Sequence, residues 1–168
     1  MTPSGSSYRE IPLSQDKVAL VSAEDYEDVS RWKWYAWWNP SGHAWYAVRS
    51  VGGSSEPGRS IRMHRHIMGL DFGDKRQVDH RNHDTLDNRR ENLRVATPSQ
   101  NTQSRGLQSN NSSGHKGVSY RSSRGKWRAT ITVEGRNIHL GYRDTKEECI
   151  ALYREASLRH FGEFSYGV

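Results

Sequence analysis

The sequence predicts an α+β protein built from small modules, and three observations support this class. Residues 10–62 hold short aromatic and apolar runs separated by turns, as in a small β-rich unit. Residues 63–102 give the order strand, loop, strand, helix. Residues 117–168 give three alternating strands followed by one helix backing the sheet. The expected domains are therefore a β-rich unit at 1–62, a strand–strand–helix core at 63–102, a linker at 103–116 and a sheet-and-helix module at 117–168.

Composition limits the core and points to a polyanionic partner. Only 33% of the 168 residues are hydrophobic, yet the chain has six Trp and eight Tyr, so we expect small modules that are each held by a few large rings. The formal net charge is +6, and residues 103–168 carry eleven Lys or Arg against six acidic residues. A basic chain of this kind favours nucleic acid.

Cysteine usage and hydropathy exclude other classes. Cys149 is the only cysteine, so an intramolecular disulfide and a cysteine-rich zinc site are excluded. Its position on the apolar face of the last helix makes it a small core residue. No run is long or apolar enough for a signal core or a membrane span, and we expect a cytoplasmic protein with no membrane partner.

In the N-terminal unit, strands are expected at Val18–Val21, Trp32–Trp38 and Ala44–Val51. The turn Asn39-Pro-Ser-Gly42 joins the last two into a hairpin. We interpret the tryptophans as cross-strand core material. The alternative is that they stack on bases, as in single-strand binders.

A chemically distinctive constellation occupies residues 77–101. One short strand ends in Asp79 and His80, and a second strand is followed by a helix with Thr97 as N-cap and Pro98 in its first position. This order brings Asp79 near Asn101, and carboxylate and amide oxygens suit Mg²⁺ or Mn²⁺. His80 beside them is suited to be a general base.

The loop between the two strands contains Asn92, which is placed to hold the loop of His80 by hydrogen bonding. Three further histidines lie nearby. We expect His64 and His66, in a short helical stretch, to pack or to contact phosphate, and His83 to be a solvated loop residue.

The stretch Ile61–Asn101 resembles the HNH (ββα-metal) nuclease motif of phage- and intron-encoded homing endonucleases. The likeness rests on four short motifs: Met63-His64-Arg65, Val78-Asp79-His80, Glu91-Asn92-Leu93 and Thr97 to Asn101. It is similar to the subgroup in which asparagine replaces the last histidine. The resemblance implies Asp79 and Asn101 as metal ligands, His80 as the base and Asn92 as the central structural asparagine. One departure is Arg81-Asn82-His83-Asp84, where the family more often has a shorter turn with glycine.

The C-terminal module alternates with period two. Strands are expected at Val118–Arg121, Lys126–Val133 and Asn137–Tyr142, with apolar positions toward a helix and polar positions outward. Thr145 and Glu148 form a capping box for the helix, which ends near Gly162. In the linker before it, we expect a tether in which Arg105 and Lys116 follow phosphates.

Residues 117–168 resemble the APETALA-type (ethylene-response-factor-like) DNA-binding domain, through Gly125-Lys126-Trp127, Leu140-Gly141-Tyr142 and Phe161-Gly162-Glu163-Phe164 among other matches. The resemblance implies a three-stranded sheet in the major groove, backed by one helix. The polar outer face supports base and phosphate contacts. The expected DNA-binding residues are Ser119, Arg121, Arg124, Lys126, Arg128, Thr130, Thr132, Arg136, Asn137 and His139. Several of these differ from the plant domains, so the plant target sequence does not carry over.

Together these features predict a Mg²⁺-dependent, site-specific endonuclease acting on double-stranded DNA, of the homing kind, in the cytoplasm of a bacterial host and associated with its nucleoid. Alternatives left open are a dimeric HNH restriction endonuclease and a non-catalytic DNA-binding regulator; an RNA-binding protein is weaker. The sequence leaves open the target, nicking against double-strand cleavage, the choice of monomer or homodimer, and the role of residues 1–62.

Overall fold

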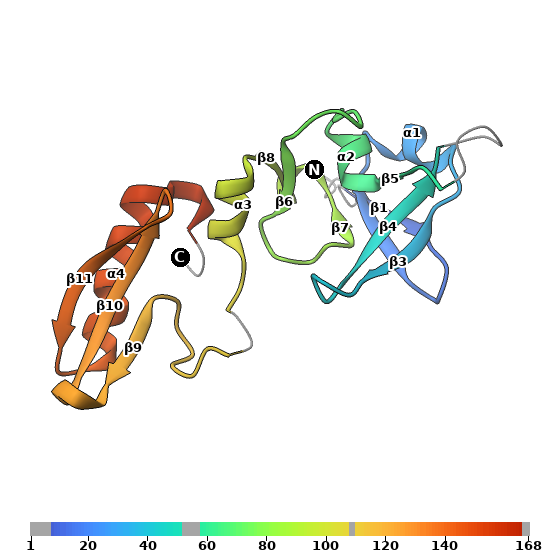
Figure 1. The fold of residues 1–168 in the computed structure, drawn as a ribbon. Helices are drawn as coiled ribbons and strands as arrows, with labels where there is room; N and C mark the ends of the chain where they lie inside the picture. Colours follow the sequence, from blue (N-terminus) through green and yellow to red (C-terminus); the bar gives the residue numbers. More distant parts are fainter. Residues whose placement is uncertain (1–7, 52–57, 108–109, 166–168) are drawn as a thin grey trace, which may run out of the picture. The chain divides into compact units, whose positions relative to one another are not determined.

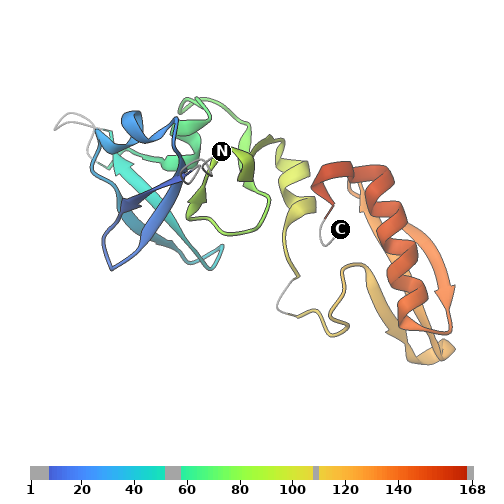
Figure 2. The same ribbon diagram turned by 180° about the vertical axis from the view of Figure 1, so that it is seen from behind.

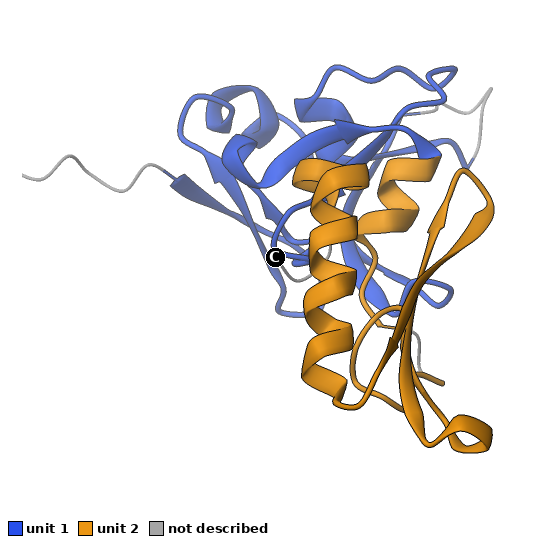
Figure 3. Ribbon diagram, turned by 90° about the vertical axis from the view of Figure 1, so that its left-hand side faces the viewer, with its two compact units in different colours: residues 1–98 blue, residues 99–168 orange. Residues whose placement is uncertain are grey.

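A computed structural model describes residues 8–51, 58–107 and 110–165. The chain forms two compact units, residues 1–98 and 99–168 (Figure 3). Both mix strands and helices, which confirms the α+β class. The expected β-rich unit and residues 63–98 of the expected nuclease core fall together in the first unit, and residues 99–102 of that core are counted with the second. Helix α3 (Pro98–Ser104) begins at the boundary.

The first unit contains small sheets and short helices (Figure 1). In chain order its elements are β1 (Tyr8–Pro12), β2 (Val18–Ser22), α1 (Tyr26–Ser30), β3 (Tyr35–Asn39), β4 (Ala44–Ser50), β5 (Ser60–Arg62), α2 (Met63–Ile67), β6 (Gln77–His80), β7 (Asp87–Asn88), η1 (Arg90–Asn92) and β8 (Leu93–Ala96). Its sheets have the strand orders β1-β2-β7, β3-β4-β5 and β6-β8. β7 joins the first sheet as a parallel strand beside β2.

One hydrophobic core holds this unit together. It joins Val21 of β2, Ala47 of β4, Met63 of α2, and Val78 and Leu93 of the β6–β8 pair. Met63 and Val21 are fully buried, and such a side chain stabilises the fold by roughly 1.5–3 kcal/mol. The N-terminal strands and the pair that carries Asp79 and His80 therefore share one core.

The segment Trp32–Trp38, which was expected to be one strand with its tryptophans in the core, differs from that expectation in two ways. The strand begins at Tyr35 rather than Trp32, because α1 precedes it and the indole N–H of Trp34 donates to the carbonyl of Val29 at 2.9 Å. Trp34 is core material, at 4% exposure, but Trp37 and Trp38 are 39% and 41% exposed. Trp32 is exposed as well, at 46%, so the interpretation of the tryptophans as core was wrong for these three. The expected hairpin of β3 and β4 is confirmed.

The second unit matches its expected elements closely. They are α3, β9 (Val118–Arg121), η2 (Ser122–Arg124), β10 (Lys126–Val133), β11 (Arg136–Arg143), α4 (Lys146–Phe161) and η3 (Gly162–Phe164). The sheet order is β11-β10-β9, and α4 covers one face of it, as Figures 1 and 2 show from opposite sides. Cys149 is fully buried against Ala129 and Val118, which confirms it as a core residue.

The start of α4 confirms the capping box. The Thr145 hydroxyl accepts a hydrogen bond from the amide of Glu148, and the Glu148 carboxylate accepts one from the amide of Thr145. These bonds satisfy donors that the first helical turn leaves unpaired.

The segment before β9 is hydrogen-bonded rather than an extended tether. α3 continues to Ser104, and the Asn111 side chain bonds both the His115 carbonyl and the Gly114 amide. The ammonium of Lys116 donates to the carbonyls of Gln103 and Arg105 at 2.7 and 2.8 Å. The pKa of Lys116 is lowered, chiefly by burial. Lys116 thus fastens this segment instead of facing outward to phosphates.

Candidate active site

Asp79 and His80 lie at the end of β6, and both are buried, at 6% and 5% exposure. β8 pairs with β6 in antiparallel register, with Arg94 opposite Asp79 and Leu93 opposite His80. Buried polar side chains are costly unless their groups are paired. The contacts of these two residues therefore define what the site can do.

Asp79 is engaged by Arg94 across the two strands. The guanidinium donates from Nε and Nη2 to Oδ2 of Asp79 at 2.8 and 2.6 Å. Arg94 is itself 8% exposed. Removing one partner of such a pair leaves a charge in a dry environment and costs roughly 3–5 kcal/mol. Arg94 consequently fixes the Asp79 carboxylate in one orientation.

Asn88 of β7 orients the ring of His80. The two side chains share a hydrogen bond, while the Asn88 amide nitrogen donates to the carbonyl of Leu86 at 3.0 Å. The amide oxygen of Asn88 is thus the group that accepts from the ring. Within the described residues the Nε2 atom of His80 is buried and has no hydrogen-bond partner, so the bond falls on Nδ1. A neutral ring that donates from Nδ1 keeps its lone pair on Nε2.

The electrostatic surroundings favour neutral His80. Burial lowers its pKa below the ordinary value of 6.5, against the opposing effects of Asn88 and of the carboxylates of Asp79, Asp84 and Asp87. A neutral imidazole with a bare Nε2 has the protonation state that a general base requires.

The loop that follows His80 is held by Asn92. Its side-chain oxygen accepts from the amide of Asn82 at 2.9 Å, and its side-chain nitrogen donates to the carbonyl of Asp87 at 2.7 Å. The Arg81 amide donates to the carbonyl of Asn92 at 2.9 Å. Asn92 is 5% exposed. It thus makes the loop-holding contacts that the sequence analysis assigned to it.

His83 occupies the turn in which related motifs more often have glycine. Its φ is 64°, a left-handed conformation that costs a non-glycine residue free energy. The amide of His83 donates to the carbonyl of His80 at 3.0 Å. Its side chain is exposed, in keeping with a solvated loop residue. The departure from the motif therefore leaves the turn intact.

A cluster of rings packs against His80. The ring centroid of His64 lies 5.1 Å from that of His80, and Tyr46 lies 5.6 Å from His64 and 6.4 Å from His80. The guanidinium of Arg62 stacks over Tyr46 at 4.6 Å. Burial, His80, Arg62 and Arg65 all lower the pKa of His64 well below 6.5. His64 is therefore a neutral packing partner of the site.

His66 takes a separate role away from this cluster. Its Nε2 contacts the Asp28 carboxylate at 2.8 Å, and its Nδ1 lies 3.4 Å from Arg49. It packs edge-on against Trp34. His66 thus ties α2 to the α1 region of the first unit.

Asn88, Arg94 and Tyr46 were missed by sequence reasoning. The register of the 77–80 and 93–96 segments would have placed Arg94 opposite Asp79. The only sequence feature that could have pointed to Asn88 was its position next to Asp87 in the Asn-rich loop after His80. Tyr46 reaches the site only through tertiary packing, and no local pattern reveals it.

The donor set for a metal ion is small. No group of three or more His, Cys, Asp or Glu side chains is gathered for a metal within the described residues. The expected ligands are the carboxylate of Asp79 and the amide oxygen of Asn101, which lies partly buried in α3 and is counted with the second unit. Two hard oxygen donors fit Mg²⁺ or Mn²⁺ and suit zinc poorly.

The expected DNA-binding residues lie on the sheet and η2 of the second unit, and none is buried. Cross-strand partners bring several onto one face: Lys126 lies opposite Arg121, Arg128 opposite Ser119, Thr130 opposite His139 and Thr132 opposite Asn137. Arg124, in η2, stacks over Tyr142. This face carries a row of cationic, hydroxyl and amide groups.

Two details modify that face. Arg136 lies opposite Val133, so its register places it with the helix-side positions at the end of β11. A bulge between Ala129 and Thr130 skips Leu140, which packs in the core. Three members of the face are engaged with one another or with neighbours: Lys126 pairs with Asp144 at 3.0 Å, and Thr132 donates to the side chain of Asn137 at 2.6 Å.

In the part of the chain that the structure describes, no helix is long and apolar enough to span a membrane. No solved structure matches the chain.

Comparison with known proteins identifies the family. The family model described as HNH endonuclease matches residues 62–103, the segment that carries Asp79, His80, Asn92 and Asn101. An uncharacterized HNH endonuclease of Acanthamoeba polyphaga mimivirus is 31% identical over 151 residues, covering 88% of this chain and 72% of that protein. Protein 3.8 of Escherichia phage T7 is 34% identical over 88 residues, covering 52% of this chain and 72% of its own length. The chain belongs to the HNH endonuclease family.

Proposed function

We propose that the protein is a site-specific endonuclease of the homing kind that hydrolyses DNA phosphodiesters with one divalent metal ion, Mg²⁺ or Mn²⁺. The observation that carries the proposal is the environment of His80. Burial lowers the pKa of its ring, the Asn88 side chain contacts the ring, and Nε2 has no partner among the described residues, beside the carboxylate of Asp79. Few structural roles require a buried imidazole with one bare nitrogen.

In the proposed reaction, Nε2 of His80 accepts a proton from water as the water oxygen attacks phosphorus. The bond from phosphorus to the 3′-oxygen breaks, which leaves a 5′-phosphate and a 3′-hydroxyl. The positive charge on the ring is stabilised by the hydrogen bond to Asn88 and by the nearby carboxylates. The residues proposed to hold the divalent ion are Asp79 and Asn101, and the ion would supply charge neutralisation at the phosphate and at the departing oxygen.

Target reading is proposed for the second unit. Its outward face carries Arg121, Lys126 and Arg128 beside hydroxyl and amide groups, which supports base and phosphate contacts by an APETALA-like sheet. The two relatives come from a phage and a giant virus, and this origin favours a nuclease of a mobile or viral genome.

Incubation of supercoiled phage or plasmid DNA with the protein tests the proposal. We expect relaxed or linear products with Mg²⁺ and none with EDTA, and their ends should carry 5′-phosphates. Metal-independent cleavage would refute the metal role. Tight DNA retention without cleavage of a target-containing DNA would favour the DNA-binding regulator. Complete cleavage at one short palindrome would favour the restriction endonuclease.

A further inference from the structure

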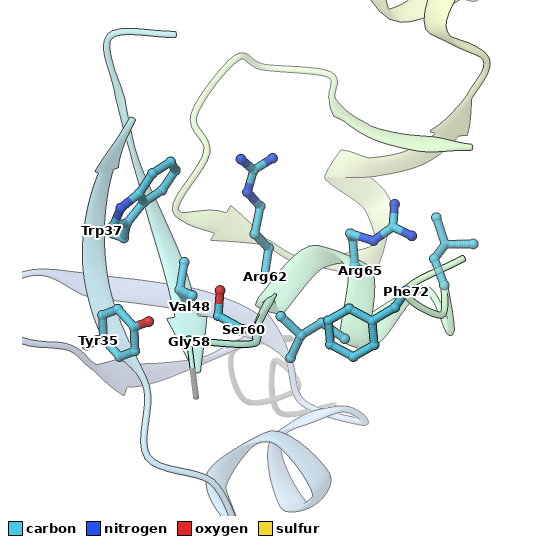
Figure 4. A pocket seen from close by; sticks show the side chains of 10 residues that line it. Tyr35, Trp37, Val48, Gly58, Ser60, Arg62, Arg65 and Phe72 are labelled. Atoms are coloured by element: carbon cyan, nitrogen blue, oxygen red, sulfur yellow. The ribbon is translucent and has the colours of Figure 1, made fainter. Parts of the chain in front are cut away.

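An aromatic cavity of about 480 Å³ lies in the first unit, on the outward face of the β3-β4-β5 sheet (Figure 4). The strand register defines that face. Trp37 lies opposite Tyr46, and Tyr35 and Arg62 both lie opposite Val48. Ala36 and Ala47, on the opposite face, are buried. The sheet thus turns rings and an arginine away from its core.

The lining of this cavity combines aromatic faces with positive charge. Trp37, Tyr35 and Phe72 contribute rings, and Arg62 and Arg65 contribute the charged side chains; no acidic side chain of the described residues lines it. Trp37 and Phe72 remain 39% and 46% exposed. Large exposed rings gathered with arginines are typical of a binding surface.

Arg62 is the cation best placed to bind a ligand. Its guanidinium lies over Tyr46 at 4.6 Å and over Trp37 at 5.5 Å, and within the described chain its side chain makes no ion pair or hydrogen bond. Arg65 differs, because it donates to the backbone carbonyls of Arg76, Asp71 and Asp74. Arg62 therefore keeps the planar N–H groups with which arginine binds phosphate.

Ring contacts connect Arg62, which lines the cavity, to the candidate active site. Tyr46 contacts Arg62 on one side and the rings of His64 and His80 on the other. A DNA strand whose phosphate lies at His80 would thus run past Arg62 within a few nucleotides. Charge and position both favour the cleaved strand as the occupant.

We propose that this cavity binds a nucleotide of the cleaved strand whose base has left the duplex stack, with the base against Trp37 and a neighbouring phosphate on Arg62. A volume of about 480 Å³ has room for one nucleotide. Stacking on an aromatic ring tolerates every base, so this subsite adds affinity and strand distortion, while sequence is read elsewhere. The inference rests on the proposed nuclease function, whose substrate it shares.

The test measures binding of single-stranded oligonucleotides by the full-length protein in EDTA, where no cleavage is needed. We expect Trp37→Ala to weaken binding about tenfold and Trp37→Phe to restore most of it, since the ring face is kept. Trp38→Ala is the matched control: Trp38 is equally exposed and adjacent, but it pairs with Trp45 on the other face and should change affinity less than twofold. Arg62→Met should weaken binding and reduce its salt dependence by about one ion.

Photo-crosslinking locates the contact. Oligonucleotides that carry 5-bromodeoxyuridine should crosslink to Trp37 or to a ring beside it. Crosslinks confined to other parts of the chain, or affinities of Trp37→Ala and Arg62→Met within twofold of the parent protein, would overturn the subsite. Because these assays need no turnover, absence of metal-dependent cleavage would refute the nuclease proposal alone and leave the subsite result standing.

Discussion

Burial acts on His80 in two ways. It lowers the pKa of the ring, so that the neutral form prevails near pH 7. It also raises the energetic cost of losing a hydrogen bond to the ring, because water cannot replace the lost partner. Asn88 is then a positioning residue. Its side chain is the hydrogen-bond partner of the His80 ring, whose Nε2 has no partner among the described residues.

Substitution of Asn88 by alanine tests that role. We expect Asn88→Ala to lower the single-turnover cleavage rate about 10–100-fold with little change in DNA affinity, since the ring loses its preferred tautomer. The unfolding free energy should fall by roughly 1–3 kcal/mol, because a buried donor loses its partner.

Asn88→Asp is the matched control, since its carboxylate can still accept from Nδ1. Nitrogen-15 NMR of the histidines should show the Nδ1–H tautomer of His80 in the parent protein and in Asn88→Asp, and mixed tautomers in Asn88→Ala. An unchanged tautomer in Asn88→Ala would remove Asn88 from the account.

His64 makes stability depend on pH. Its folded-state pKa lies well below 6.5, through burial first and then through His80, Arg62 and Arg65. The unfolded chain therefore binds the proton more readily, and stability must fall as pH drops below about 6.5, by at most about 1.4 kcal/mol per pH unit for this group.

Urea unfolding between about pH 7.5 and 5.5 checks this prediction. His64→Gln should lose less stability on acidification than the parent protein does. His83→Gln, at an exposed loop position, should leave the slope unchanged. Parallel curves for His64→Gln and the parent would contradict it.

The sequence was sufficient to nominate Asp79, His80 and Asn92, because each stands at a strand end or within a short loop beside it. Arg94, Asn88 and Tyr46 escaped because they depend on strand register, on a two-residue strand and on tertiary packing. Strand register, a two-residue strand and tertiary packing cannot be read from the residues next to a position in the sequence.

At the scale of elements, period-two alternation predicted β9 and β10 residue for residue, and a capping box predicted the start of α4. β7 was not predictable, since two residues carry no periodicity and the strand exists only by pairing with β2. α1 was missed for a similar reason: five residues offer little more than one turn.

The outward face of β10 is the part of the second unit that we expect to contact DNA. Arg128 lies in mid-strand opposite Ser119, so Arg128→Ala should weaken DNA binding several-fold and reduce the salt slope by about one. Electrophoretic mobility shifts at several salt concentrations measure both. Arg159→Ala, on the exposed surface of α4 and paired with Glu155, is the control. Equal affinity of Arg128→Ala and the parent at moderate salt would exclude Arg128 from the interface.

At the scale of the molecule, the described residues carry one candidate active site on a shared core, and the second unit carries the sheet that we propose binds DNA. One site cuts one strand at a time. With supercoiled plasmid and limiting protein, open circles should therefore accumulate before linear DNA on agarose gels. Linear product at the earliest times would instead show a dimer with two sites acting together.

The most direct test of the account is chemical rescue of His80→Ala. We expect this variant to bind DNA like the parent protein and to cleave at least about 1,000-fold more slowly, since the base is gone. Added imidazole should restore part of the rate by entering the space of the lost ring. Cleavage by His80→Ala within threefold of the parent protein, with imidazole or without it, would contradict the assignment of His80 as the base.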